Sequence, residues 1–198
     1  MFKPFAAAFA LVVFTLMLAG SNFSPASAGT TWNTFGGIPF GETVADTRSM
    51  MAVKGYTFSE RTAAGNDRFL GRILDTKTDI IAFYDDTSHL AKFLVNIETA
   101  DDDARQVFNQ LHTQLIAKYG DPRSDYHFFS SPYTDGDGYA NSAIKLGKGT
   151  FSTYWPQPDG TDMVWLEITK QLTVEVGYEG PTWDAYVDRR RANGSKDL

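Results

Sequence analysis

The sequence contains no cysteine, and this absence excludes several classes of protein. Without a thiol there is no disulfide, no zinc–thiolate site, no nucleophilic cysteine and no lipid-modified cysteine of the bacterial lipoprotein type. The sequence also lacks a Gly-x-Ser-x-Gly elbow, a His-Glu-x-x-His motif and a phosphate-binding glycine loop followed by Lys-Ser/Thr. A domain of this kind must be held together by its core alone, which suits a bacterial periplasm or exterior better than a eukaryotic secretory route.

Long hydrophobic runs are rare, and the one at residues 5–18 follows the single charge of Lys3 and precedes Ala26-Ser27-Ala28. This pattern predicts a secretory signal peptide over residues 1–28, cut after Ala28. An uncleaved anchor is the competing interpretation, but about 14 apolar residues fall short of the roughly 20 that a spanning helix needs. We therefore expect a periplasmic or secreted protein with no membrane anchor after cleavage.

Positive charge is also limited, because 24 acidic residues outnumber 18 basic ones and give a formal net charge of −6. Such a balance is a poor match for the phosphate backbone, so a nucleic-acid partner is not expected. The length predicts one main domain over residues 29–180. Residues 181–198 are expected to form a C-terminal helix and a frayed tail, with Pro181 in the first turn.

Two further helices have clear signals. Residues 101–119 place apolar side chains at three- and four-residue spacing, and Gly120 follows as a C-terminal cap. The acidic residues 101–103 are expected to cap this helix; a metal site is the alternative reading of the same triplet. Residues 43–54 form the second helix, which begins with a capping box of Thr43 and Asp46.

Between and after these helices the pattern changes to alternation, which predicts antiparallel strands with one buried face. The expected strands are residues 69–74, 80–84, 90–97, 125–130, 143–146, 150–155, 163–169 and 172–178. The fold class is thus α+β: antiparallel meanders packed on two main helices in two layers, with a short C-terminal helix. The order of helix and strands occurs twice, which is consistent with either a degenerate duplication or a single meander.

The last two strands allow a prediction of register, because facing residues of a hairpin lie on the same side of a sheet. Placing Ile168 opposite Leu172 requires a loop of residues 169–171 and sets Trp165 beside Glu175 on the wet face. Such a tryptophan is either a contact for a ligand or partner, or is covered by neighbouring side chains.

A resemblance rests on residues 38–43, Ile-Pro-Phe-Gly-Glu-Thr, which lead into a short helix and a meander. This opening resembles those of small secreted bacterial α+β domains of uncharacterised function. In outline the chain is also similar to the fold shared by β-lactamase inhibitor proteins and the small lipoproteins of outer-membrane β-barrel assembly. This chain lacks the cysteine anchor of the lipoproteins and the disulfides of the inhibitors, so neither function transfers. The resemblance implies a non-catalytic envelope or secreted domain that acts through protein contacts.

Candidates for catalysis are few, because the chain has only three histidines, His89, His112 and His127, without the spacing of metal ligands. If the protein is an enzyme, His112 and His127 are the candidates for acid or base, with Asp125 or Glu167 as partner, joined by tertiary folding. The Asp-Gly loop within residues 130–141 does not match the ligand pattern of an EF-hand and is expected to be a long mobile connection.

The sequence therefore predicts a secreted or periplasmic binding protein of the bacterial envelope, with no evident catalysis and with no cofactor or metal. Its partner is expected to be another envelope or extracellular protein. The alternative is an extracellular hydrolase that uses carboxylates and a histidine, and a small-ligand carrier is a third possibility. The candidate binding surface combines aromatic and acidic side chains, namely Trp165, Glu167, Glu175, Tyr133, Tyr139 and Trp155.

Overall fold

A computed structural model describes residues 34–157 and 163–194 of the chain. The predicted signal peptide and its cleavage site lie outside these ranges, as do residues 158–162. None of the helices in the described ranges combines the length and the apolar character that are needed to cross a membrane.

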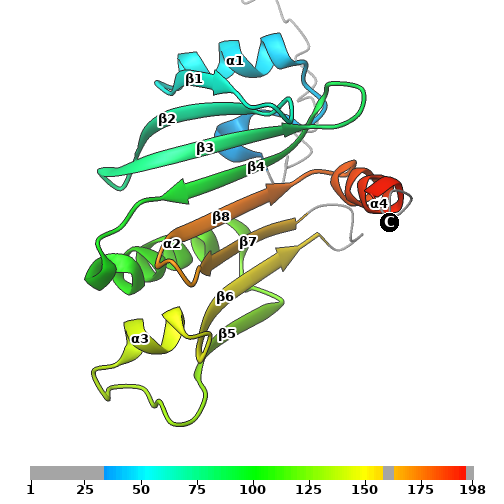
Figure 1. Ribbon diagram of the computed structural model, residues 1–198. Coiled ribbons are helices and arrows are strands. Elements are labelled where there is room, and N and C mark those ends of the chain that lie inside the picture. The colour runs from blue at the N-terminus through cyan, green and yellow to red at the C-terminus, as the bar shows by residue number, and fades with distance from the viewer. Residues whose placement is uncertain (1–33, 158–162, 195–198) are drawn as a thin grey trace, which may run out of the picture.

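The described elements alternate helices with antiparallel strands (Figure 1). The first half contains a 3-10 turn η1 (Phe35–Gly37), α1 (Val44–Val53), β1 (Thr57–Arg61), β2 (Asp67–Ile73), β3 (Thr76–Tyr84) and β4 (Leu90–Ile97). The second half contains η2 (Asp101–Asp103), α2 (Ala104–Tyr119), β5 (Ser124–Phe129), α3 (Ala140–Lys145), β6 (Gly149–Pro156), β7 (Met163–Ile168), β8 (Val174–Glu179) and α4 (Trp183–Gly194).

The eight strands form one antiparallel sheet in the order β1-β2-β3-β4-β8-β7-β6-β5. This confirms the predicted α+β class. Each half is a helix followed by a four-strand meander, and the last strands of the two halves, β4 and β8, pair with each other at the centre. The order of the strands is therefore symmetric about the β4–β8 pair.

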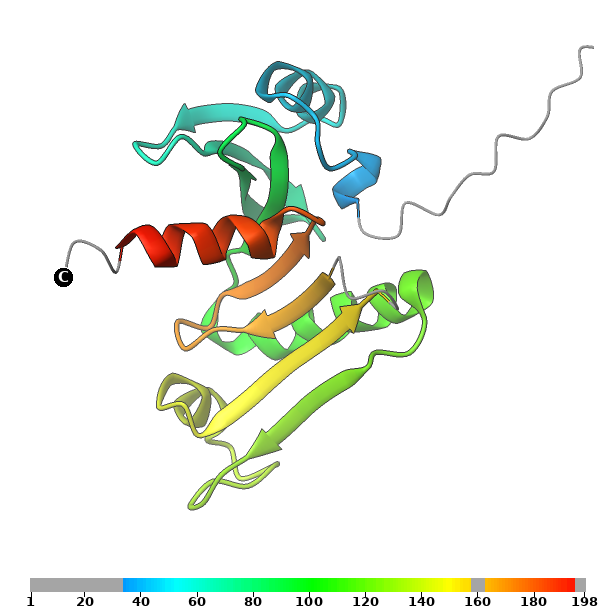
Figure 2. The same cartoon turned by 90° about the vertical axis from the view of Figure 1, so that its right-hand side faces the viewer.

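The helices α1 and α2 cover one face of this sheet, while α4 projects from the other (Figure 2). The covered face carries the alternate apolar residues of the central strands, including Phe93, Val95, Leu166 and Val176, which are at most 3% exposed. From α2, Phe108 and Leu111 pack into the same core. The residues between them along each strand form the second face, which we call the open face.

The ends of α1 and α2 agree only in part with the expected caps. The side chain of Thr43 accepts a hydrogen bond from the amide of Asp46, so Thr43 caps α1 as predicted, and the carboxylate of Asp46 points back and accepts from the Thr43 hydroxyl. At α2 the prediction was wrong, because Asp103 makes no capping hydrogen bond. Instead residues 101–103 form a 3-10 turn, and Asp101 pairs with Lys145 of α3. At the other end, Gly120 has φ 80° and closes the helix as predicted.

Two expectations about strands are corrected. Residues 143–146 were expected as a strand, but residues 143–145 form the end of α3 and Leu146 is its C-terminal cap, because Ala143 and Ile144 are the buried side of a short helix. The register of the β7–β8 hairpin is shifted by two residues: Ile168 faces Val174 rather than Leu172, and Trp165 faces Gly177 rather than Glu175. Leu172 remains buried, but its φ of 62° places it in the turn, where its amide donates to the carbonyl of Thr169.

Candidate functional site

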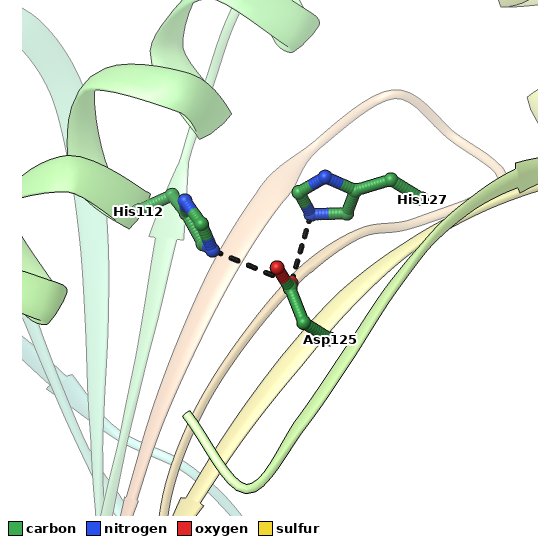
Figure 3. Close-up of side chains that lie close together, drawn as sticks. All are labelled: His112, Asp125 and His127. Atoms are coloured by element: carbon green, nitrogen blue, oxygen red, sulfur yellow. Dashed lines mark ion pairs between the residues drawn. The ribbon is translucent and has the colours of Figure 1, made fainter. Parts of the chain in front are cut away.

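Two histidines and an aspartate meet between α2 and the edge strand β5 (Figure 3). His112 lies on α2, whereas Asp125 and His127 are two residues apart on β5 and share the covered face of the sheet. The carboxylate oxygen Oδ1 of Asp125 is 3.3 Å from Nε2 of His112 and 3.0 Å from Nε2 of His127. The three side chains offer one ligand atom each within 4.8 Å of one another.

Aromatic contacts hold the ring of His112. It stacks on Phe108, one helical turn earlier, with a centroid distance of 5.9 Å and an interplanar angle of 13°. The indole of Trp155 lies 6.0 Å away on another side. Among the residues that the structure describes, the buried Nε2 of His112 has no hydrogen-bond partner. The ring is therefore fixed by packing, with its Nε2 directed at Asp125 (Figure 3).

The ring of His127 stacks on Phe151, its cross-strand partner, at a centroid distance of 5.5 Å. Burial lowers the pKa of His127; the charge of Asp125 acts in the opposite direction, and His112 lowers the pKa further. The lowered pKa favours the neutral imidazole, in which one ring nitrogen carries a lone pair.

Asp125 is oriented by the neighbouring strand. It faces Thr153 of β6, and the Thr153 hydroxyl donates a hydrogen bond of 2.6 Å to its Oδ1. Thr153 is fully buried, whereas the side chain of Asp125 is 38% exposed. The carboxylate thus has a fixed inner support and an accessible outer side.

Two hollows lie along α2, and one of them adjoins the cluster. The long hollow, of about 910 Å³, lies between the exposed side of α2 and residues 136–141. The aromatic hollow, of about 430 Å³, is lined by Arg105, Asn109, His127, Phe128, Phe129, Tyr133, Thr134, Asp135 and Phe151. Arg105 and Asn109 line both, so the two hollows are neighbours along α2, and the aromatic hollow reaches the cluster at His127.

The segment after β5 forms the outer wall of these hollows. Asp135 pairs with Arg105 at 3.2 Å, and the carboxylate of Asp137 accepts hydrogen bonds from the amides of Thr134 and Tyr139. These backbone bonds lower the pKa of Asp137, with the Thr134 amide contributing most. Farther along, the side-chain amide of Asn141 donates a hydrogen bond to the backbone carbonyl of Asp101. This bond connects the segment to η2, just before α2.

The six residues predicted as a binding surface do not form one surface. Trp155 is 1% exposed beneath α2, and its Nε1 donates to the carbonyl of Gly120, so its assignment to a recognition edge is wrong. Tyr133 lines the aromatic hollow on the covered side of the sheet. Tyr139 is 63% exposed just before α3.

The other three predicted residues, Trp165, Glu167 and Glu175, lie on the open face. Lys92 is placed between two indoles, 5.1 Å from the ring of Trp165 and 4.7 Å from that of Trp183 in α4. Trp165 also donates to Glu179, the ion-pair partner of Lys92. Trp165 is therefore half-buried by its neighbours, which was the second of the two interpretations left open for it.

The alternative catalytic set is brought together in part. His112, His127 and Asp125 meet, whereas Glu167 lies on the opposite face of the sheet. Sequence reasoning missed Arg105, Asn109 and Phe151, which line the hollows next to this cluster. One signal was present for two of them, since Arg105 and Asn109 belong to the polar side of an amphipathic helix.

Comparisons with known proteins add no identification. No family model, no curated protein and no solved structure matches this chain.

Proposed function

We propose that this chain is a secreted or periplasmic binding protein that holds an extended segment of a partner protein in the cleft along α2. The long hollow and the aromatic hollow together make up this cleft. The observation that carries the proposal is that a polar hollow and an aromatic hollow share Arg105 and Asn109 in their walls, and so lie next to each other along α2.

The long hollow suits a peptide main chain. Its α2 wall presents exposed, uncharged side chains that are able to donate or accept hydrogen bonds. They follow one another at helical spacing and are Gln106, Asn109, Gln110, Thr113 and Gln114. Each amide side chain offers both donors and an acceptor, the same groups that an extended backbone presents. Among the described residues, those that line this hollow include no aromatic side chain, so they offer no flat apolar platform on which a sugar ring would stack.

The aromatic hollow suits a single anchoring side chain. Phe128, Phe129, Tyr133 and Phe151 contribute apolar surface, and its size falls within the range of ligand pockets. Binding energy in protein complexes concentrates where one large side chain fills such a pocket. Arg105 lines both hollows, and its guanidinium lies 5.2 Å from the ring of Phe151.

Site-specific photo-crosslinking in the producing cells tests this proposal. A photoreactive phenylalanine analogue at Gln110 is expected to give a covalent adduct with a second protein. The same analogue at Val53, which is 90% exposed on α1, is the control and should give none. Asn109→Trp fills both hollows and should abolish the adduct, whereas Val53→Trp should not. The proposal is overturned if no adduct forms at Gln110 or if Asn109→Trp leaves it unchanged.

The second candidate function is hydrolysis of an extracellular polymer, because His127 lies 3.0 Å from Asp125, lines a hollow and has a pKa lowered by burial. A histidine in this setting is able to act as a general base. The purified mature protein would be assayed against cell-wall and other extracellular polymers. Turnover that disappears in both His112→Ala and His127→Ala would favour this function over binding.

A further inference from the structure

We propose that His112, Asp125 and His127 form a binding site for a divalent transition-metal ion, with Zn²⁺ as the best match. This inference goes beyond the proposed peptide cleft, because neither hollow needs an ion to bind a peptide. It rests on the distances, the fixed orientation and the chemical identity of the three groups.

Two of the three separations between the ligand atoms agree with those between ligands of a single ion. Two ligands that each lie about 2.0–2.1 Å from Zn²⁺ are about 2.9 Å apart at a right angle and about 3.4 Å apart at the tetrahedral angle. The observed separations of 3.0 and 3.3 Å between Asp125 Oδ1 and the two Nε2 atoms fall within this interval. The ligand atoms of the two histidines lie within 4.8 Å of each other, so binding of an ion would bring these two rings closer together.

The three ligand groups are also held in place before any ion binds. The rings of His112 and His127 are stacked on Phe108 and Phe151, and the hydroxyl of Thr153 supports the carboxylate. Outer hydrogen bonds of this last kind orient ligands in established metal sites. Preorganisation lowers the conformational entropy that ion binding has to offset.

The buried Nε2 of His112 is a second, independent indication. It has no hydrogen-bond partner among the described residues, although a buried polar atom normally has one. Oδ1 of Asp125 lies 3.3 Å from Nε2 of His112, but the two atoms do not form a hydrogen bond. Coordination of an ion through the lone pair of this nitrogen would satisfy the atom.

The donor set selects the class of ion. Two imidazole nitrogens and one carboxylate oxygen suit Zn²⁺ and its neighbours Co²⁺, Ni²⁺ and Cu²⁺. Mg²⁺ and Ca²⁺ prefer sites made entirely of oxygen, and the chain has no thiolate for soft ions. Three protein ligands leave a tetrahedral ion one further position for water or another ligand. The side chains of His127 and Asp125 are 34% and 38% exposed, so an ion can reach them from solvent.

Metal titration of the mature protein, stripped with a chelator, tests the site. Isothermal calorimetry should show one equivalent of Zn²⁺ bound with a dissociation constant in the micromolar range or below. Bound Co²⁺ should give the intense visible absorption of a tetrahedral nitrogen–oxygen site. Zn²⁺ should also raise the midpoint of thermal unfolding, because an ion that binds only the folded state stabilises it.

His127→Gln and Asp125→Asn should each weaken Zn²⁺ binding by at least tenfold and remove its effect on thermal unfolding. The matched control is His89→Ala, which removes the third histidine, at the start of the β4 region, and should leave binding unchanged. Thermal unfolding of each metal-free variant shows that it is folded. The proposal is overturned if the wild-type protein binds no Zn²⁺ at millimolar concentration, if His127→Gln retains full affinity, or if His89→Ala loses it.

Discussion

Glu167 and Glu175 face each other across β7 and β8 in the middle of the open face. Burial raises the pKa of both carboxyl groups; at Glu175 the neighbouring Glu167 raises it further, and Lys92 acts in the opposite direction on both. Two carboxylates are therefore held side by side where their charge is unfavourable.

Neutralising either residue of this pair should stabilise the protein at neutral pH. Because the folded-state pKa is raised, the folded protein binds the proton more tightly, and stability falls as the pH rises above about 4.3. Glu175→Gln and Glu167→Gln should each gain up to about 1 kcal/mol at pH 7 and lose this gain near pH 4. Urea unfolding at several pH values measures the difference. Glu98→Gln, an exposed control paired with Lys77, should show no such gain.

Replacing Lys92 should destabilise the protein and loosen α4. Its ammonium pairs with Glu179 at 2.7 Å, and both side chains are only 12% exposed. Lys92→Met should cost about 2 kcal/mol in free energy of unfolding, between the values for exposed and buried ion pairs. It should also shift the fluorescence of Trp165 and Trp183. Lys77→Met, which breaks an exposed pair, should cost less than about 0.5 kcal/mol.

Asp67 should be among the most sensitive polar positions. It is fully buried on β2, where Arg48 donates to both of its oxygens at 2.7 and 2.8 Å and the hydroxyl of Tyr84 donates at 3.1 Å. Asp67→Asn leaves the Arg48 charge without its partner and should cost about 3 kcal/mol. Chemical denaturation measures this loss. A cost below about 1 kcal/mol would show that the pair contributes little.

Gly177 should not tolerate a side chain while Trp165 is present. A Cβ added at Gly177 would overlap the indole of its cross-strand partner Trp165. Gly177→Ala should therefore cost about 2 kcal/mol, as overpacking does. The same substitution in a Trp165→Ala background should be nearly neutral, and this double-mutant cycle isolates the clash. Equal costs in the two backgrounds would contradict the explanation.

Elements with strong local signals were predictable from the sequence. The strand at Leu90–Ile97 has the predicted bounds, because its alternation is uninterrupted. The capping box at Thr43 marked the start of α1 correctly. In contrast, a four-residue apolar run such as 143–146 fits a buried turn of helix as well as a strand, so its periodicity could not decide between them.

The predicted register of the last hairpin was wrong, for a physical reason that the sequence pattern does not show. Leu172 is apolar and belongs to the buried set, which favoured its pairing with Ile168. In the structure it is buried from a turn, because the hydroxyl of Thr169 accepts hydrogen bonds from the amides of Gln171 and Thr173 and tightens the loop. A same-face argument fixes parity but not a shift of two residues.

Part of the candidate site could be predicted from the sequence. Asp125 and His127 are two residues apart on a strand and so share a face, and His112 follows the buried Phe108 by four residues on α2. The way in which α2 approaches β5, however, depends on the packing of the whole sheet. The cluster could therefore be named as a possibility, but its distances required the structure.

The pairing of β4 with β8 has a consequence for how the chain folds. Each meander is built from neighbouring strands, whereas this central pair joins residues as distant as Lys92 and Glu179. Until the end of the chain has been synthesised, β4 has no neighbour on one side and exposes a long edge able to pair with other chains. Closing such a non-local contact slows folding, so we expect the first half to need protection from aggregation until the last strand arrives.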